Sequence, residues 1–134
     1  MAVDGLITMR SSHGPADTMD KLEAAVKAKG MSVFARIDHA TGAAKAGLSL
    51  RATELLIFGN AKAGTPLMQQ LQSIGIDLPL KALVWQDESG STWLSYNDPV
   101  WLAKRHGLGQ ELDAAVSAMA AGLGAIARAV TAPA

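Results

Sequence analysis

The sequence contains no cysteine, and this absence removes several kinds of chemistry at once. Without a thiol the chain can form no disulfide, no thiolate zinc site and no cysteine nucleophile. Its three histidines, His13, His39 and His106, share neither helical nor strand spacing, so no metal site is predicted from them. The Gly-x-Ser-x-Gly elbow of serine hydrolases is missing as well. Nothing in the sequence calls for a cofactor.

An excess of positive charge is also missing, because twelve basic side chains are balanced by twelve acidic ones. Nucleic-acid-binding proteins usually carry a basic surface, since each phosphate they neutralise needs a cation. No uninterrupted apolar stretch approaches the roughly 20 residues of a membrane-spanning helix. The N-terminus lacks the basic and apolar regions of a signal peptide. We therefore expect a cytoplasmic protein that binds neither nucleic acid nor a membrane.

What the sequence does contain is the pattern of one α+β domain over residues 1–134. Hydrophobic residues make up 49% of the chain, which is enough for a sizeable core. Strand patterns are found at residues 5–12, 31–38, 53–58, 80–86 and 91–96. Helices are expected after Pro15, after Thr65-Pro66 and after Asp98-Pro99, where a proline or a capping residue marks the first turn. A short helix or tight loop is expected at residues 40–48.

The C-terminal segment carries a separate signal. Apolar residues there repeat in alternating steps of four and three: Leu112, Val116, Met119, Leu123, Ile126 and Val130. This spacing predicts a long helix at residues 108–130 that lies across a sheet or against a partner helix. Residues 131–134 are expected to be a loose tail.

The order of these elements predicts the fold class. It reads strand, helix, four strands with helical insertions, then a final helix. Asp87-Glu88-Ser89-Gly90 is a hairpin signal between the last two strands. We therefore expect two layers, a largely antiparallel sheet with helices on one face.

Five segments resemble the domain of unknown function 302 family and occur in that family's order. They are FARIDH at 34–39, LIFGN at 56–60, GTPLM at 64–68, LPLK at 78–81 and YNDP at 96–99. The resemblance covers residues 1–107 and implies a two-layer α+β fold related to the TATA-binding-protein-like architecture. It also implies a tendency to form homodimers. It implies no activity, and likeness of fold to a DNA-binding protein does not transfer function.

Polar residues at the ends of two predicted strands suggest a ligand site. Between Gly59 and Gly64 the backbone could form a nest for an anion, with Lys62 adding charge. The competing interpretation is that Gly59 and Asn60 shape a turn while Thr65 caps a helix. The lysine that a phosphate-binding loop places after its second glycine is missing.

The second strand ends in Arg36, Asp38 and His39. A carboxylate that orients an imidazole can support acid–base chemistry. The structural alternative is an outward Arg36–Asp38 pair, with the imidazole capping a loop. Lys81, within an otherwise apolar strand, could neutralise an acidic ligand or discourage aggregation at a sheet edge. Trp85, Trp93 and Trp101 are interpreted as core or dimer-interface residues.

The leading hypothesis is a homodimer that binds a small ligand, such as a small anion, in a pocket between sheet and helices. Its candidate residues are Arg36, His39, Gly59, Asn60 and Lys81. A first alternative is an enzyme acting on a small acidic substrate, with His39 as general base and Lys81 or Arg36 as an electrostatic clamp. A second is a structural or partner-binding module that uses the helix at residues 112–130, in which case truncation after His106 would abolish self-association or partner capture without unfolding the sheet.

Overall fold

The five expected strands form one sheet in the computed structural model, which describes residues 2–134. Their bounds are β1 Leu6–Ser11, β2 Ser32–Asp38, β3 Thr53–Gly59, β4 Leu80–Gln86 and β5 Thr92–Asn97. Neighbours in the sheet follow the order β1-β5-β4-β3-β2, and every neighbouring pair is antiparallel. The predicted α+β fold with a largely antiparallel sheet is confirmed.

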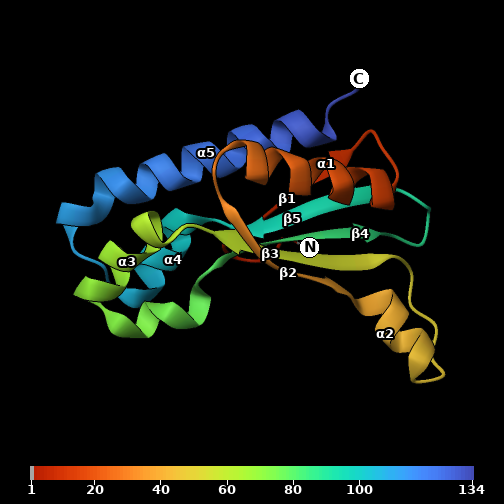
Figure 1. Ribbon diagram of the computed structural model, residues 1–134, viewed down its shortest axis with the longest axis horizontal. Helices are drawn as coiled ribbons and strands as arrows, with labels where there is room; N and C mark the ends of the chain where they lie inside the picture. Colours follow the sequence, from red (N-terminus) through yellow and green to blue (C-terminus); the bar gives the residue numbers. More distant parts are fainter. Residues whose placement is uncertain (1) are drawn as a thin grey trace.

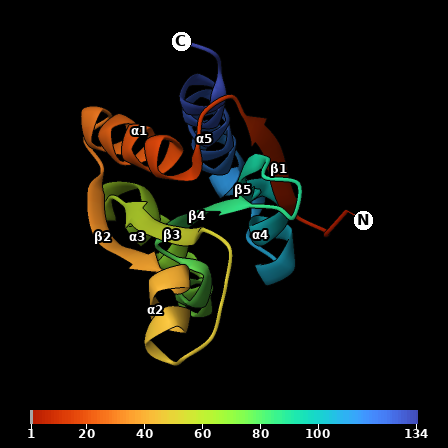
Figure 2. The same cartoon turned by 90° about the vertical axis from the view of Figure 1, so that its right-hand side faces the viewer.

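The helices gather on one face of the sheet and at its two ends. Their bounds are α1 Pro15–Ala28, α2 His39–Lys45, α3 Ala61–Gln70, α4 Pro99–His106 and α5 Asp113–Thr131, with 3₁₀ turns η1 Gln72–Asp77 and η2 Gln110–Leu112. Figures 1 and 2 show α1 and α5 side by side over the same face. Figure 1 also shows α2 at one end of the sheet, with α3 and α4 at the other. Over the centre of the opposite face lies no helix of the described residues (Figure 1).

The core lies between this sheet and the α1–α5 layer. Phe58 and Leu56 of β3 are fully buried there, as is Met19 of α1. Helix α5 adds Leu123 and Ile126 from the predicted apolar repeat. Burying a side chain of this size contributes about 1.5–3 kcal/mol. Because α5 forms part of this core, its removal would expose the sheet, which contradicts the expectation that the sheet stays folded without it.

Helix α5 is also the most apolar helix of the described chain. By length and composition the helical stretch Gln110–Thr131 could cross a membrane, with a mean hydropathy of 1.5. Of the most apolar 18-residue stretch of this helix, 39% is buried inside the protein. Of its buried residues, Leu123, Ile126, Ala127 and Val130 belong to the core cluster, as expected of a helix that covers a sheet.

The start of α3 differs from the prediction. The helix begins at Ala61, and Pro66 lies inside it rather than in its first turn. Asn60 is the capping residue, since its side-chain oxygen accepts a hydrogen bond from the Ala63 N–H at 2.8 Å. Asparagine caps a helix at least as well as threonine. In the second turn of α3, Pro66 lacks the N–H that would bond the Lys62 carbonyl, and an interior proline of this kind usually kinks a helix or costs about 3 kcal/mol.

The C-terminal tail is also more ordered than expected. Thr131 is the last residue of α5, and its carbonyl accepts a hydrogen bond from the Ser12 N–H at 2.8 Å. The Ala132 carbonyl lies 2.7 Å from Nε2 of His13. These bonds join the end of α5 to the connection between β1 and α1, so the predicted loose tail is wrong for residues 131 and 132.

Candidate functional site

Two adjoining cavities form one groove beside α5. The first has a volume of about 320 Å³ and lies among the start of β2, α3 and the start of β4. The second, of about 530 Å³, lies between α3, the α1–β2 connection and α5. Both are lined by Asn60, Ala63, Leu80 and Met119. We call the combined space the α3–α5 groove, and its size is that of a small-ligand site.

The lining of the α3–α5 groove is mostly apolar. Met68, Leu78 and Pro79 line the first cavity, and Met31 and Ile126 the second. Helix α5 turns a row of small residues toward the groove, namely Ala115, Ala118, Gly122 and Ala125. The only charged side chains in the lining are Lys29 and Lys62, and no carboxylate lines it. An apolar ligand that carries negative charge would suit this composition.

Gly59 and Asn60 both line the groove, but they do not form the predicted anion nest. Residues 61–64 are helical, so the glycine-bounded segment is not a loop. The Ala63 N–H, which a nest would offer to an anion, is bonded to the Asn60 side chain. Gly59 is buried, and a Cβ there would lie 3.6 Å from the Pro79 ring. These two residues shape one wall of the groove.

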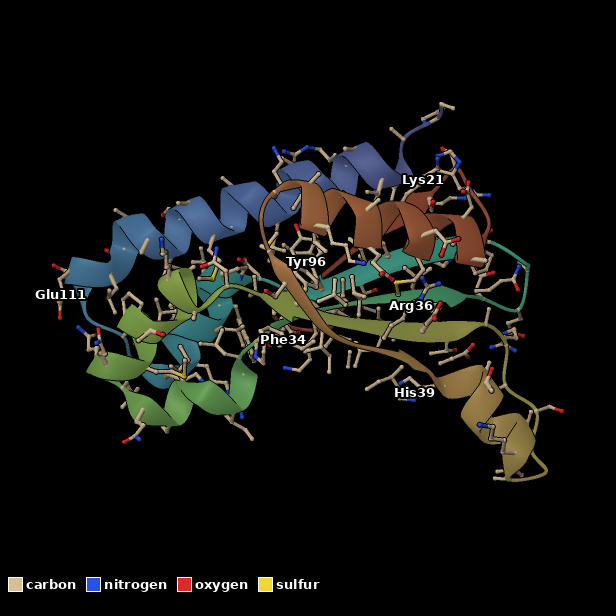
Figure 3. The ribbon with its side chains drawn as sticks, in the orientation of Figure 1. Lys21, Phe34, Arg36, His39, Tyr96 and Glu111 are labelled. Atoms are coloured by element: carbon tan, nitrogen blue, oxygen red, sulfur yellow. The ribbon has the colours of Figure 1, made fainter. Side chains whose placement is uncertain are left out.

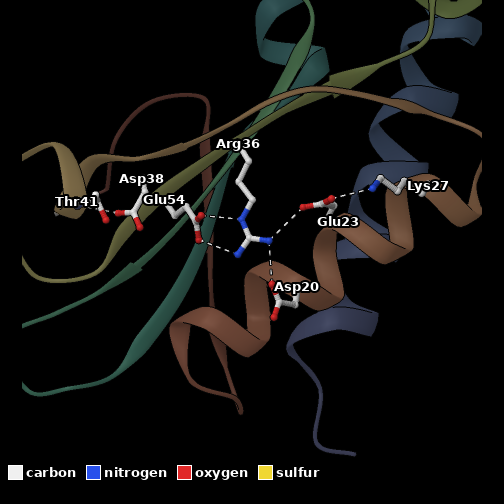
Figure 4. Close-up of polar contacts among 7 residues, drawn as sticks. All are labelled: Asp20, Glu23, Lys27, Arg36, Asp38, Thr41 and Glu54. Atoms are coloured by element: carbon white, nitrogen blue, oxygen red, sulfur yellow. Dashed lines mark hydrogen bonds and ion pairs between the residues drawn. The ribbon is translucent and has the colours of Figure 1, made fainter.

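Arg36 is held by carboxylates from two elements (Figure 4). Its Nε donates to Glu54 at 2.6 Å, and its Nη1 donates to Asp20 at 2.8 Å and to Glu23 at 3.1 Å. The hydrogen bonds with Glu54 are the main reason that the pKa of Arg36 is raised above its ordinary value. The pKa of Glu23 is lowered mainly by the hydrogen bond from Lys27 and next by that from Arg36. With its donors engaged, Arg36 ties the edge strand β2 to α1 and is not free to clamp a substrate.

The predicted Arg36–Asp38 pair is not formed. Asp38 is the N-cap of α2 and accepts a hydrogen bond from the Thr41 N–H at 3.0 Å. That bond is the main reason why the pKa of Asp38 is lowered. Asp38 therefore does not orient His39, which is the first residue of α2 and exposed.

His39 and Lys81 lie on the other face of the sheet from Arg36. Both line a shallow cavity of about 430 Å³ together with Leu55, Leu83 and Trp85. Figure 3 shows Arg36 on the side of α1 and His39 on the opposite side. Lys81 donates a long hydrogen bond, 3.3 Å, to the Pro79 carbonyl. Because β4 is the middle strand of the sheet, Lys81 does not guard a sheet edge.

The five candidate residues therefore occupy three places. Gly59 pairs with Ser32 at the start of β2, whereas Asp38, at its end, pairs with Glu54. Six residues of strand separate these two positions, roughly 20 Å at the usual rise per residue. The structure brings Gly59 and Asn60 together, and His39 and Lys81 together, but it does not join all of them in one pocket.

The face of the sheet away from α1 and α5 carries an uncovered apolar patch, beside which lie the polar residues Thr8, Lys81 and Ser95. We call it the open sheet face and define it by Leu6, Ile37, Leu55, Ile57, Leu83, Trp85 and Trp93. Trp85 and Trp93 are cross-strand partners with ring centroids 6.1 Å apart. Each indole N–H is bonded, that of Trp85 to Ser95 and that of Trp93 to Asp87. Trp101 lies elsewhere, on α4.

A third polar cluster, which the sequence did not reveal, joins η1 to α4. Asp77 Oδ2 lies 2.8 Å from Arg105 Nη1 and 2.5 Å from His106 Nε2. Gln70, at the end of α3, adds a contact to the segment before α5. Its side-chain amide N–H donates to Glu111, and its side-chain oxygen accepts a hydrogen bond from the Gly109 N–H. The partners stand 28 or more residues apart, so no spacing rule finds them. None of them lines the groove or the cavity at Lys81, which points to a structural role.

Within residues 2–134 no group of three or more histidine or acidic side chains is placed to hold a metal ion.

Comparison with known proteins supplies a family but no chemistry. The family model described as "Domain of unknown function DUF302" matches residues 7–126. A crystal structure of an uncharacterized conserved DUF302 protein from Bacillus stearothermophilus covers 97% of this chain with a TM-score of 0.84. At 20% identity that likeness bears on the fold alone.

Two curated relatives come from Brucella. "Fluoride-specific ion channel FluC 1" of Brucella suis is 51% identical over 124 residues, which are 92% of this chain and 49% of that protein. The protein of the same name in Brucella abortus is also 51% identical, over 46% of its length. The chain thus spans about half the length of these relatives, and their name describes whole proteins that extend well beyond the matched part.

Proposed function

This chain belongs to the DUF302 family, whose function is unknown, and we propose that it is a homodimer that binds a small ligand in the α3–α5 groove. The observation that carries this proposal is the groove itself, a space of ligand size with an apolar lining and few polar groups. The partly buried methionine and leucine side chains of such a space gain from further covering. We expect the dimer to be cytoplasmic.

Gly122→Trp tests the proposal by filling the groove. Gly122 lines the second cavity, and a Cβ at this position would meet no atom within 4 Å. The indole should occupy the space of a ligand without disturbing the core, and replacing a mid-helix glycine by tryptophan adds a few tenths of a kcal/mol of stability. We expect the affinity for the neutral dye N-phenyl-1-naphthylamine, followed by fluorescence, to fall at least about tenfold. The melting temperature should not decrease.

Ser117→Trp is the matched control, because Ser117 is an exposed residue of α5 that does not line the groove. Its dye affinity should equal that of the unmodified chain. The proposal is wrong if the dye does not bind the unmodified protein, or if both tryptophan variants bind it equally well.

The open sheet face supports the dimer. An antiparallel sheet can leave one face to water when that face is polar. Here part of the face is apolar. Ile37, Leu55 and Leu83 lie side by side in one row, which continues into Ser95, and Trp85 lies beside Trp93 in the next row. A contiguous apolar surface of this kind is typical of a protein–protein contact. A second copy of the same chain could cover it in a self-complementary manner.

A second candidate function is that of a companion domain of an ion channel. The Brucella proteins named fluoride-specific channels share 51% identity with nearly all of this chain, at less than half of their own length. In this chain α5 is the only described helix apolar enough to span a membrane, and it belongs to the core. A membrane pore in those relatives would then lie in the other half, with the matched half beside it.

Fluoride efflux from vesicles tests this second candidate. The full Brucella suis protein should release fluoride at a rate at least about twofold different from the same protein without its matched half, as read by a fluoride electrode. Adding the present chain to the shortened protein should restore part of the difference. Equal rates in all three samples, with the shortened protein inserted normally, would rule the companion role out.

A further inference from the structure

We propose that the occupant of the α3–α5 groove is a single-chain amphiphile with an anionic head, bound through Lys29 and Lys62. This inference rests on the proposed function, because it names the chemical class of that ligand. The groove offers a long apolar lining to an alkyl chain and two ammonium groups to its head.

The two lysines differ from the neighbouring lysines of α1 in having no ion-pair partner. Lys21 and Lys27, on α1, each pair with a carboxylate one helical turn away. Lys29 and Lys62 form no ion pair with any residue of the described range 2–134. They come from different parts of the fold, Lys29 from the end of α1 and Lys62 from the first turn of α3, and both line the second cavity.

The charge of the groove therefore has one sign. Its lining holds these two cations and no carboxylate, although the chain as a whole is neutral. An anion at this position would be attracted by both ammonium groups, whereas a cation would meet only repulsion. Lysine stems are themselves apolar, so they can lie along a bound chain while the ammonium remains in water.

The rest of the lining favours an alkyl chain over a compact polar anion. Leu80 and Met119 line both cavities and connect them. Ala118 and Gly122 are exposed, and their small side chains leave an open channel along α5. Each methylene that such a channel takes from water should improve affinity about fourfold. A head group alone, such as acetate, would gain none of this.

Displacement of bound N-phenyl-1-naphthylamine tests the class of ligand. Decanoate and decyl phosphate should displace the dye at concentrations at least about tenfold lower than decanol or decyltrimethylammonium, and acetate should not displace it. Direct calorimetry with decanoate checks that displacement reports binding. High salt should narrow the gap between decanoate and decanol, because the lysines are exposed.

The double variant Lys29→Gln/Lys62→Gln assigns the head group to these lysines. Its decanoate affinity should fall about 5- to 30-fold, as expected for two exposed ion pairs, while decanol stays within about twofold. Lys45→Gln is the control, since Lys45 is an exposed lysine of α2 outside the groove. Equal binding of decanol and decanoate, or equal losses in the double variant and in the control, would overturn the inference and leave the groove as a neutral site. Absence of dye binding to the unmodified protein would instead remove the proposed function itself.

Discussion

Gly5→Ala is expected to destabilise the protein by about 2–5 kcal/mol, far more than the same change at Gly90. Gly5 precedes β1 with a φ of +77°, and a Cβ there would overlap the indole ring of Trp101. A left-handed backbone costs a residue other than glycine about 1–2 kcal/mol, and overpacking adds about 1–3 kcal/mol. The backbone at Gly5 is restrained from shifting away from the indole, because the Gly5 carbonyl accepts a hydrogen bond from the Asp98 N–H at 2.7 Å.

Gly90→Ala separates the two costs. Gly90 has a φ of +84°, but a Cβ there would meet no atom within 4 Å, so only the backbone cost of about 1–2 kcal/mol should remain. Urea unfolding of both variants measures the difference. In a chain that already carries Trp101→Ala, the Gly5→Ala change should lower the free energy of unfolding by less than it does in the unmodified chain. The difference is the steric part of the cost, because the overlapping indole is gone. Equal losses at the two glycines would show that the contact between Gly5 and Trp101 does not confine the N-terminal end of β1.

The contact between Gly5 and Trp101 also shows what the sequence could not reveal. Local signals sufficed for the elements: strand alternation marked the strands, and Asp98-Pro99 marked the start of α4, where Asp98 does cap the helix by accepting from the Val100 N–H at 3.0 Å. Nothing in either stretch connects a glycine at position 5 with a tryptophan 96 residues later. Such a pairing depends on α4 packing beside β1.

The candidate site depended on the same kind of information. Gly59 and Asn60 were predicted as part of an anion nest; the nest is not formed, but both residues line the groove. Lys29 and Lys62 could not be grouped, since one ends α1 and the other begins α3. Arg36 was misjudged because its partners on α1 and β3 are 13 to 18 residues away. Strand register, which the sequence does not specify, placed His39 far from the Gly59 turn.

Leu83→Asp should be monomeric at protein concentrations at which the unmodified chain is the proposed dimer. This difference should hold over at least about a hundredfold range of concentration. Leu83 lies in the central row of the open sheet face, between Leu55 and Ser95 on the neighbouring strands. If a second copy covers this face, the new carboxylate is buried without a partner, which typically costs several kcal/mol. Leu83 is only partly buried in the single chain and is not part of the core cluster, so the fold should tolerate the change. Sedimentation velocity of both proteins measures the dimer fraction.

Ile76→Asp distinguishes loss of this interface from a general effect of added charge. Ile76 is 75% exposed on η1 and does not belong to the open sheet face, so this variant should remain a dimer. Tryptophan fluorescence offers a second readout, because Trp85 and Trp93 lie beside Leu83 on that face and should shift to longer wavelength when the dimer separates. Two results would refute the assignment of the open sheet face as the dimer contact: a wild-type chain that is monomeric at every concentration, or a Leu83→Asp variant that dimerises as tightly as Ile76→Asp. Either result would leave the α3–α5 groove untouched, since its lining contains neither residue.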